Sequence, residues 1–388
     1  GFVVDESTSL GTRSVVGPYE VDPGRTRIMQ SAAQMVPSKA LHVQDSALCG
    51  SCHTLHTHTL GPKGEVIGEL PEQVPYLEWK HSDYGGIQGC PSCHMPEVEG
   101  EMPISSTLGQ SRPDFARHVF RGGNFFMPRM LNSHRDVLGV VAEPLEMATV
   151  SARTTEHLQS ASARLAVEGV RIESGILRTE VVITNQAGHK LPTAYPSRRA
   201  WIHLTVVDGR GAVVFESGRL NGDGSIAGND NDADKARFEP HYAEISRPDQ
   251  VQIYEPILGA PGDKVTTGLL AATRYLKDNR LLPSGFDKAT ADGDIAVKGE
   301  AMADADFKAG GDRIRYAVPL GEASGPFSVR VELWYQPIGY RWAMNLKEYD
   351  TPESAQFIRF FDGMASATAA LLARKQGTIN PPQAGAGR

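Results

Sequence analysis

Two pentapeptides, Cys49-Gly50-Ser51-Cys52-His53 and Cys90-Pro91-Ser92-Cys93-His94, contain all four cysteines of this 388-residue chain. Each has the form C-x-x-C-H, the attachment signature of c-type haem. In such a site the two thiols bond to the two vinyl groups of the porphyrin, and the histidine ligates the iron from the proximal side. The sequence therefore predicts two covalently attached c-type haems. The thiols would be those of Cys49, Cys52, Cys90 and Cys93, and the proximal ligands His53 and His94.

The same four cysteines allow a second interpretation, a four-thiolate zinc site, because paired C-x-x-C motifs also bind zinc. That interpretation leaves the histidine after each pair unexplained. It also requires the 37 residues between Cys52 and Cys90, a longer separation than most zinc ribbons use. The haem interpretation accounts for both histidines, and we favour it.

The composition excludes several classes of function. The chain is 40% hydrophobic and 22% charged, with a net charge of −7, which is typical of a globular protein. No run approaches the roughly 18 apolar residues of a membrane-spanning helix. A nucleic-acid partner is not expected, because no stripe of lysine and arginine is present to neutralise phosphates. Covalent haem attachment takes place outside the bacterial cytoplasmic membrane, so we expect an exported protein, periplasmic or extracellular; a zinc protein would be equally at home in the cytoplasm.

The chain is long enough for two domains, and its composition and hydrophobic pattern change near residue 165. Residues 1–164 are rich in Gly, Pro and His and predict an irregular, partly helical dihaem cytochrome c domain, ending in a helical segment from about 136 to 165. From 165 to 345, apolar residues alternate with polar ones at a period of two, for example over 177–183, 202–206 and 329–335. This alternation, with a tight turn at Asp208-Gly209-Arg210-Gly211, predicts an antiparallel β-sandwich.

Two further segments complete the predicted α+β fold. A long insertion at 219–311 is expected to be irregular, with a helix over 268–277. The segment 346–388 is predicted to form a C-terminal helix and a flexible tail. Thr351-Pro352-Glu353 provides an N-cap hydroxyl, a proline in the first turn and an acid near the helix dipole. The helix would continue through the Ala-rich run to Leu372, and the tail would begin at Gly377.

The second axial ligand of each iron decides whether a haem carries electrons or binds a small molecule. Most histidines precede residue 135, which favours histidine as that ligand. His118 lies beside Phe120 and a flexible Gly-Gly pair, and His189 lies in a loop at the end of a predicted strand, where a rigid scaffold presents functional groups. We expect these two as distal ligands. The alternates are His81, His42, His56 and His58.

One acidic stretch offers closely spaced oxygen ligands for calcium, at 221–225 and 229–234. It is not an EF-hand, because Lys235 and His241 stand where the glycine and the glutamate of that loop would be required. A solvated loop is the alternative. The sequence contains no phosphate-binding glycine loop and no H-E-x-x-H motif.

Several stretches resemble a group of bacterial multihaem c-type cytochromes in which a small haem domain precedes a β-rich domain. They are 90–96 (CPSCHMP), 118–131 (HVFRGGNFFMPRML), 185–201 (NQAGHKLPTAYPSRRAW), 275–283 (YLKDNRLLP) and 335–346 (YQPIGYRWAMNL), with shorter ones at 48–55, 76–84 and 251–255. The resemblance implies covalent haem c, export, electron transfer and irons with two histidine ligands, which supports His118 and His189. Larger members carry more haem sites than this chain.

The sequence thus favours an exported dihaem cytochrome c that passes electrons between protein partners over an enzyme, a question that it leaves open. It would act alone, as a homo-oligomer or as a subunit of a larger electron-transfer complex. The competing hypothesis is a haem enzyme in which one iron keeps an open position and reduces a small substrate such as peroxide.

Overall fold

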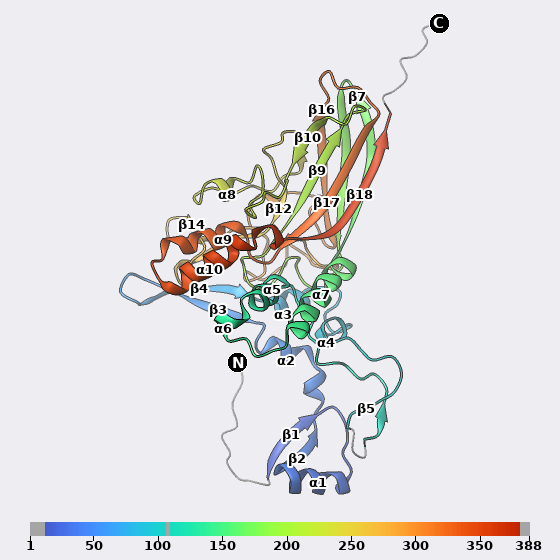
Figure 1. Cartoon of the computed structure of the whole chain (residues 1–388), viewed down its shortest axis with the longest axis vertical. Helices are drawn as coiled ribbons and strands as arrows, with labels where there is room; N and C mark the ends of the chain where they lie inside the picture. Colours follow the sequence, from blue (N-terminus) through green and yellow to red (C-terminus); the bar gives the residue numbers. More distant parts are fainter. Residues whose placement is uncertain (1–11, 106–108, 381–388) are drawn as a thin grey trace.

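The structure is a computed structural model that describes residues 12–105 and 109–380. It is a mixed α+β fold, as predicted. Figure 1 shows an elongated molecule with most β-strands at one end and the pentapeptide-bearing segment below them. At the far end, β1 (Arg13–Gly17) and β2 (Met35–Lys39) pair in parallel beside α1 (Pro23–Ala33), a helix without a buried side chain.

The pentapeptide-bearing segment consists of short elements joined by turns. They are η1 (Leu41–Gln44), α2 (Ser46–Gly50), β3 (Leu55–Leu60), β4 (Val66–Gln73), α3 (Pro75–Lys80), α4 (Cys90–His94), β5 (Met102–Pro103) and β6 (Ser111–Arg112). Strands β3 and β4 form an antiparallel hairpin. None of these helices is long enough to be stable alone, so the segment depends on what it packs against.

Three helices connect this segment to the β-strands: α5 (Phe126–Ser133), α6 (Arg135–Leu138) and α7 (Pro144–Ala161). The helix predicted over 136–165 is therefore interrupted, and α7 begins anew with a capping box between Glu143 and Glu146 and a proline in its first turn. It also ends earlier than predicted. Ala163 and Leu165 belong to the next strand, β7 (Ala163–Glu173), where both side chains are buried at alternate positions and pack in the core.

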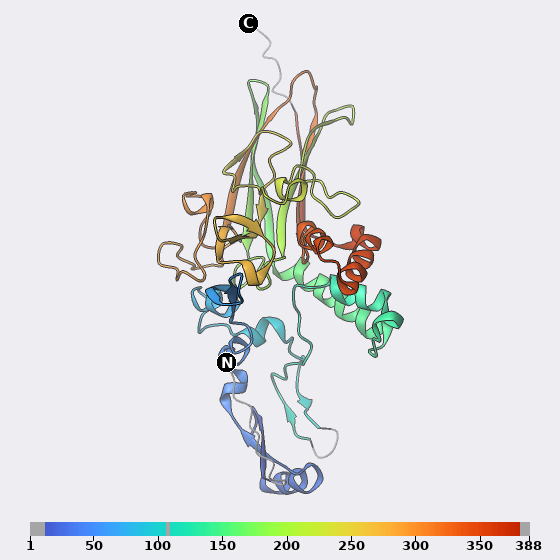
Figure 2. The ribbon, with the colours of Figure 1, turned by 90° about the vertical axis from the view of Figure 1, so that its left-hand side faces the viewer.

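Two sheets make up the β-rich part. The first has the order β11-β16-β8-β7, from β11 (Glu244–Ile245), β16 (Gly311–Pro319), β8 (Ile176–Asn185) and β7. The second has the order β10-β9-β17-β18, from β10 (Val213–Ser217), β9 (Arg199–Val207), β17 (Phe327–Gln336) and β18 (Ala370–Ile379), and β12 (Ile253–Tyr254) also pairs with β9. Figure 2 shows them as two layers. All neighbouring pairs are antiparallel except β11–β16.

The inward faces of the two sheets share one hydrophobic core. Leu177, Val181 and Ile183 of β8 are buried at alternate positions, as the period of two predicted. Leu204 of β9 and Val331 of β17 face them from the other sheet, in register with one another. Each such side chain contributes roughly 1.5–3 kcal/mol to folding. The turn predicted at 208–211 joins β9 to β10, and Asp208 accepts hydrogen bonds from the backbone of Arg210 and Ala212.

The C-terminal part differs from its prediction. Helix α10 (Pro352–Gly363) begins where expected, and Thr351 accepts a hydrogen bond from the Ser354 amide. The helix ends at Gly363, however, and the residues predicted as its Ala-rich end and the start of a tail form β18, which pairs along the whole of β17. Pairing satisfies the backbone groups of an otherwise open edge, and it buries Ala370 and Leu372. The tail residues 381–388 lie outside the described residues.

The insertion 219–311 is also more ordered than predicted. It contains α8 (Asp230–Ala233), β11, β12 and a three-stranded sheet of β14 (Lys264–Thr266), β13 (Pro256–Ala260) and β15 (Arg274–Asp278). The helix expected over 268–277 is wrong. Only one 3-10 turn, η2 (Leu269–Ala271), forms there, because the following residues pair with β13 as β15. Throughout the part of the chain that the structure describes, no helix is long and apolar enough to cross a membrane.

Candidate functional site

The two pentapeptides lie beside each other although they are far apart in the sequence. Helix α2 holds Cys49 and is capped by Asp45, whose carboxylate accepts from the Ala47 amide at 2.9 Å. Helix α4 holds the second pair of cysteines, and the Cys90 amide donates to Ser46 Oγ at 3.0 Å, directly at the start of α2. The two attachment motifs therefore meet at one place.

Each pentapeptide forms a single helical turn, which is what its chemistry requires. The His53 amide donates to the Cys49 carbonyl at 2.9 Å, and residues 90–94 are helical throughout. Side chains three and four positions apart lie on one face of a helix, so both thiols and the histidine of each motif face the same side. Cys52 and Cys93 are exposed, Cys49 and Cys90 are half-buried, and no disulfide joins them.

Helix α3 packs against the first motif through a glycine. A Cβ at Gly50 would lie 2.7 Å from Cγ of Tyr76, well inside van der Waals contact. The Tyr76 ring in turn stacks on Trp79, with centroids 5.6 Å apart. A glycine at this variable position of C-x-x-C-H thus allows α3 to lie flat on α2.

Four histidines from four separate elements converge near the pentapeptides. The His94 ring has its centroid 6.1 Å from that of His189 and 6.0 Å from that of His157. Burial lowers the pKa of His53, and His94 is near enough to lower it further. His189 follows β8 and His157 lies on α7, so the β-rich part and the connecting helix each bring one histidine to the motifs.

The hydrogen bonds of two of these rings select the nitrogen that is free to bind metal. His94 Nδ1 donates to the Arg121 carbonyl, and His189 Nδ1 donates to the Lys190 carbonyl at 2.8 Å. Nε2 of both rings makes no hydrogen bond within the described residues. A backbone carbonyl on Nδ1 is the usual partner of a metal-bound histidine, because it sets the tautomer and orients the ring.

The surroundings of His53, His157 and His189 favour the neutral imidazole, which is the form that binds metal. Burial, reinforced by the charge of His94, lowers the pKa of His189 to about 4. Burial and then His94 also lower the pKa of His157, and partial burial lowers that of His53.

The ring separations can be compared with what two ligands of one iron would need. A histidine nitrogen lies about 2 Å from its metal, with the ring centroid about 1 Å beyond, so two rings on opposite sides of one iron have centroids roughly 6 Å apart. The separations of 6.1 Å and 6.0 Å from His94 both meet this requirement. Only one of the two rings can lie opposite His94 on a single iron.

A cavity of about 380 Å³ adjoins this cluster, between the residues that follow His94 and helix α7. Arg117, Arg121 and Arg153 line it, together with Glu97 and Glu99. Guanidinium groups suit carboxylates, and a haem carries two propionates. Paired thiols, ring centroids at a suitable separation, two Nε2 atoms without a hydrogen bond among the described residues and this arginine-lined cavity are features that a covalent haem needs, so the residues fit the group.

The other predicted histidines lie elsewhere. His118 is exposed and stacks on Phe120, with ring centroids 6.0 Å apart. His81, at the end of α3, donates from Nε2 to the Asp287 carbonyl at 3.0 Å, and His56 Nε2 lies 2.8 Å from Asp294 Oδ2. Both rings therefore connect the pentapeptide-bearing segment to the insertion. His42 and His58 are exposed. Among the described residues, none of these five has a ring contact with His53, His94, His157 or His189.

His157 is the histidine that the sequence did not single out. Its signal was present, because it lies on a helix between the buried Thr154 and Leu158 and therefore on the inward-facing side. Arg153, one turn earlier, lines the cavity described above. Only the packing of α7 against the pentapeptide segment reveals the role of this face.

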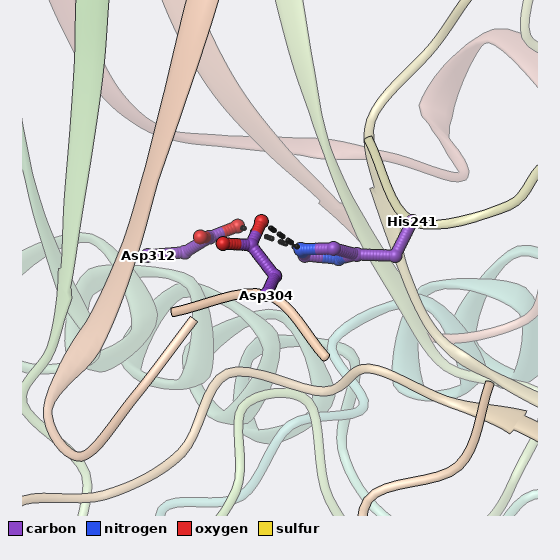
Figure 3. Close-up of side chains that lie close together, drawn as sticks. All are labelled: His241, Asp304 and Asp312. Atoms are coloured by element: carbon purple, nitrogen blue, oxygen red, sulfur yellow. Dashed lines mark ion pairs between the residues drawn. The ribbon is translucent and has the colours of Figure 1, made fainter. Parts of the chain in front are cut away.

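A second group with metal-ligand spacing lies in the β-rich part. His241 Nε2 is 3.3 Å from Asp304 Oδ2 and 3.8 Å from Asp312 Oδ2, and the side chains are almost fully buried. Figure 3 shows the three side chains pointing toward one another. Among the described residues, this is the group whose three ligand atoms all lie within 4.8 Å of one another.

The hydrogen bonds around His241 argue against a metal in this group. Gln252 Nε2 and Asn279 Nδ2 both donate to His241 Nδ1, at 2.8 Å and 3.1 Å. The orientation of both amides is set by backbone groups, since their oxygens accept from the amides of Tyr242 and Glu255. Nδ1 is therefore an acceptor, and the neutral ring carries its proton on Nε2, the nitrogen nearest the carboxylates, which in this form cannot ligate a metal although it makes no hydrogen bond.

The loop that suggested calcium uses its acidic groups in other ways. Arg199 binds Asp232 with two hydrogen bonds, at 2.8 Å and 2.9 Å, and both side chains are buried. Asp230 pairs with Arg237, and Asp223 accepts from the amide and hydroxyl of Ser225. With these carboxylates already engaged, the geometry lends the calcium prediction no support.

Comparison with known proteins adds little to this description. No family model and no curated protein matches the chain. Among solved structures, a penta-heme cytochrome c552 from Thermochromatium tepidum aligns with a TM-score of 0.49 and 16% identity, over 89% of this chain and 58% of that one. HBP35 of Porphyromonas gingivalis aligns with a TM-score of 0.20 and 8% identity, over 63% of this chain and 50% of that one. The chain thus spans less than two thirds of either protein, and neither likeness carries an argument.

Proposed function

We propose that the chain is a c-type cytochrome. The observation that carries this proposal is that two C-x-x-C-H motifs adjoin, and that two further histidines have ring centroids 6.1 Å and 6.0 Å from that of His94. Haem bound there supplies reversible one-electron chemistry at iron. His53 and His94 would be proximal, and His157 and His189 would be distal.

More specifically, we propose an exported dihaem electron carrier, periplasmic or extracellular, that passes electrons between protein partners. The Cys90 amide donates to Ser46 Oγ at 3.0 Å, at the start of the helix that carries Cys49, and this proximity of the two motifs supports rapid electron exchange between the two groups. Neutral histidines on both sides of an iron keep it low-spin and close the position that a substrate would use. The β-rich part would shield the haems, supply His189 and offer a docking surface, either for a partner or for another copy of the chain.

The distal assignment differs in its support from one histidine to the next. His189 keeps the role that the sequence predicted for it, with Nε2 free and its ring 6.1 Å from that of His94. His118 remains a prediction without that geometry, because its ring is exposed and stacks on Phe120. His157 takes its place in the proposal.

Visible and electron paramagnetic resonance spectra of the full chain, produced with covalent haem, test this proposal. We expect two low-spin haems that cyanide and carbon monoxide leave unchanged, and a high-spin component in both His157→Ala and His189→Ala. His118→Ala, the matched control, should remain low-spin. A high-spin haem in the unmodified protein would favour the alternative, an enzyme with an open iron that reduces a small substrate. A colourless protein that binds zinc would reject the haem assignment.

A further inference from the structure

Four buried charged side chains lie directly beside the loop that carries His189. They are Glu78, Lys190, Asp278 and Arg280, and none of their side chains is more than 5% exposed. Two are cations and two are anions, so the group is neutral as a whole. We call it the charge clamp.

The clamp is a continuous chain of ion pairs. Arg280 Nη1 lies 2.9 Å from Glu78 Oε1, and its Nε and Nη2 donate to the two oxygens of Asp278 at 2.8 Å and 2.7 Å. Lys190 Nζ donates to Asp278 Oδ2 at 2.7 Å. Arg280 is thereby held by two carboxylates, and Asp278 by two cations.

One of these residues, Glu78, also forms hydrogen bonds with the loop that carries His189. Glu78 Oε2 accepts from the Lys190 amide at 3.1 Å and from the Thr193 hydroxyl at 2.5 Å. On the other side of the loop, Asn185 Nδ2 donates to the His189 carbonyl at 2.9 Å and to the Leu281 carbonyl at 3.0 Å. The residue next to His189 is therefore bonded through its amide and through its side chain.

The clamp joins three elements that are distant in the sequence. Glu78 belongs to α3, in the segment that carries the pentapeptides, Lys190 follows β8, and Asp278 ends β15 in the insertion. Neighbouring contacts reinforce the junction: the Asp83 amide donates to the Ser284 carbonyl at 2.9 Å, and Ser82 Oγ donates to the Gly188 carbonyl at 3.1 Å.

Buried ion pairs are a poor source of stability, because removing charges from water costs about as much as their attraction returns. Their directional bonds nevertheless distinguish one arrangement from others of similar compactness, which apolar packing does less sharply. A histidine that must meet an iron needs this kind of positional accuracy. His189 belongs to the β-rich part and the motifs to the pentapeptide-bearing segment, so the junction between these two parts sets the position of His189 relative to the motifs.

We propose that the charge clamp is the positioning device that holds His189 at the haem, and that Glu78 is its central positioning residue. This inference rests on the proposed function. With glutamine at position 78, an amide NH₂ would face either the Arg280 guanidinium or the Lys190 amide, so the side chain could no longer hold both, and His189 could withdraw from its iron. None of the four residues touches the haem in this proposal; they act through the loop.

The test compares Glu78→Gln with Glu255→Gln in the full haem-loaded chain. Glu255 is a matched control, because it forms a buried ion pair with Lys277 at 3.2 Å and, within the described part of the chain, its carboxylate has no hydrogen bond or ion pair with the His189 loop. We expect Glu78→Gln to lose the low-spin signal of one haem and to bind carbon monoxide at that iron, with added imidazole restoring the low-spin spectrum. Glu255→Gln should keep both low-spin signals.

The outcomes separate the clamp from the function on which it rests. If Glu78→Gln remains fully low-spin and merely unfolds at lower denaturant concentration, as Glu255→Gln does, the clamp is only structural and the proposal is overturned. If Glu78→Gln does not fold, the neutral double variant Lys190→Met/Asp278→Asn is measured in its place, with the same expected high-spin signal and the same refuting result. If the unmodified chain contains no covalent haem, or if His189→Ala is fully low-spin, the fault lies in the proposed function.

Discussion

Replacing Asp312 with asparagine should stabilise this protein at neutral and alkaline pH. The side chain of Asp312 is fully buried, and its Oδ2 accepts hydrogen bonds from Tyr254 at 2.8 Å and Gln252 at 3.3 Å. Asp304 adds a second carboxylate, His241 is neutral because burial lowers its pKa to about 4, and Tyr316 faces the same space. Lys288 lies near His241, but its ammonium donates to three backbone carbonyls, and Lys277 pairs with Glu255.

Burial without a cation partner raises the pKa of Asp312 from 3.8 to about 7. Raising the pKa of Asp312 from 3.8 to about 7 means that the ionised carboxylate lowers the free energy of unfolding by up to about 4 kcal/mol. Proton binding is linked to folding, and this linkage sets the direction of the pH dependence. The folded state binds the proton more tightly than the unfolded state, so this cost is absent below pH 3.8, grows as the pH rises toward 7 and is constant above. Between pH 5 and pH 8 the unmodified protein should lose about 2–3 kcal/mol relative to Asp312→Asn.

Chemical denaturation followed by far-ultraviolet circular dichroism, at pH 5 and at pH 8, measures this difference. Asp263→Asn serves as the control, because Asp263 is exposed and pairs with Arg274. We expect the stability gain of Asp312→Asn over the unmodified protein to be larger at pH 8 than at pH 5, with no such trend for the control. An equal gain at both pH values, or a loss at pH 8, would refute the argument and show that Asp312 is ionised and satisfied in the folded protein.

Two further predictions concern the attachment motifs. Gly50→Ala should destabilise the chain by about 1–3 kcal/mol, because its Cβ would lie 2.7 Å from the Tyr76 ring, whereas Gly122→Ala, with open space around its Cβ, should be close to neutral in the same denaturation assay. Cys49→Ala/Cys52→Ala should retain one covalent haem by intact mass and by haem staining, and Cys90→Ala/Cys93→Ala should retain the other; two covalent haems in either variant would contradict the assignment of the motifs.

The strands were the most predictable part of the fold. Leu177, Val181 and Ile183 alternate in the sequence because one face of β8 meets the core, so the period of two translated directly into buried positions. The terminal residues of the chain were less predictable. An Ala-rich run has good helix propensity, but residues 370–379 form β18, because the free edge of β17 offers a full ladder of hydrogen bonds that no local pattern reveals.

The candidate site also contains residues that the sequence predicted and residues that only the structure revealed. The proposed proximal ligands follow from the C-x-x-C-H motifs, whereas only one of the two proposed distal ligands, His189, was predicted from the sequence, because a histidine can become a ligand only where its element packs against the site. His118 has a suitable local context but lies exposed on Phe120, and His157, with no distinctive local motif, lies 6.0 Å from His94 because α7 packs beside the pentapeptides. His189 was found for a reason that is partly tertiary, namely that a strand end presents a loop.

The sequence by itself therefore predicted where haem would be attached, because the proposed attachment depends on two thiols and a histidine within five residues. Only the tertiary structure decided that the two attachment sites adjoin and which histidines surround them. Contacts between residues as far apart as Glu78, Lys190 and Arg280 bring those histidines together, and such contacts form only when the whole chain has folded.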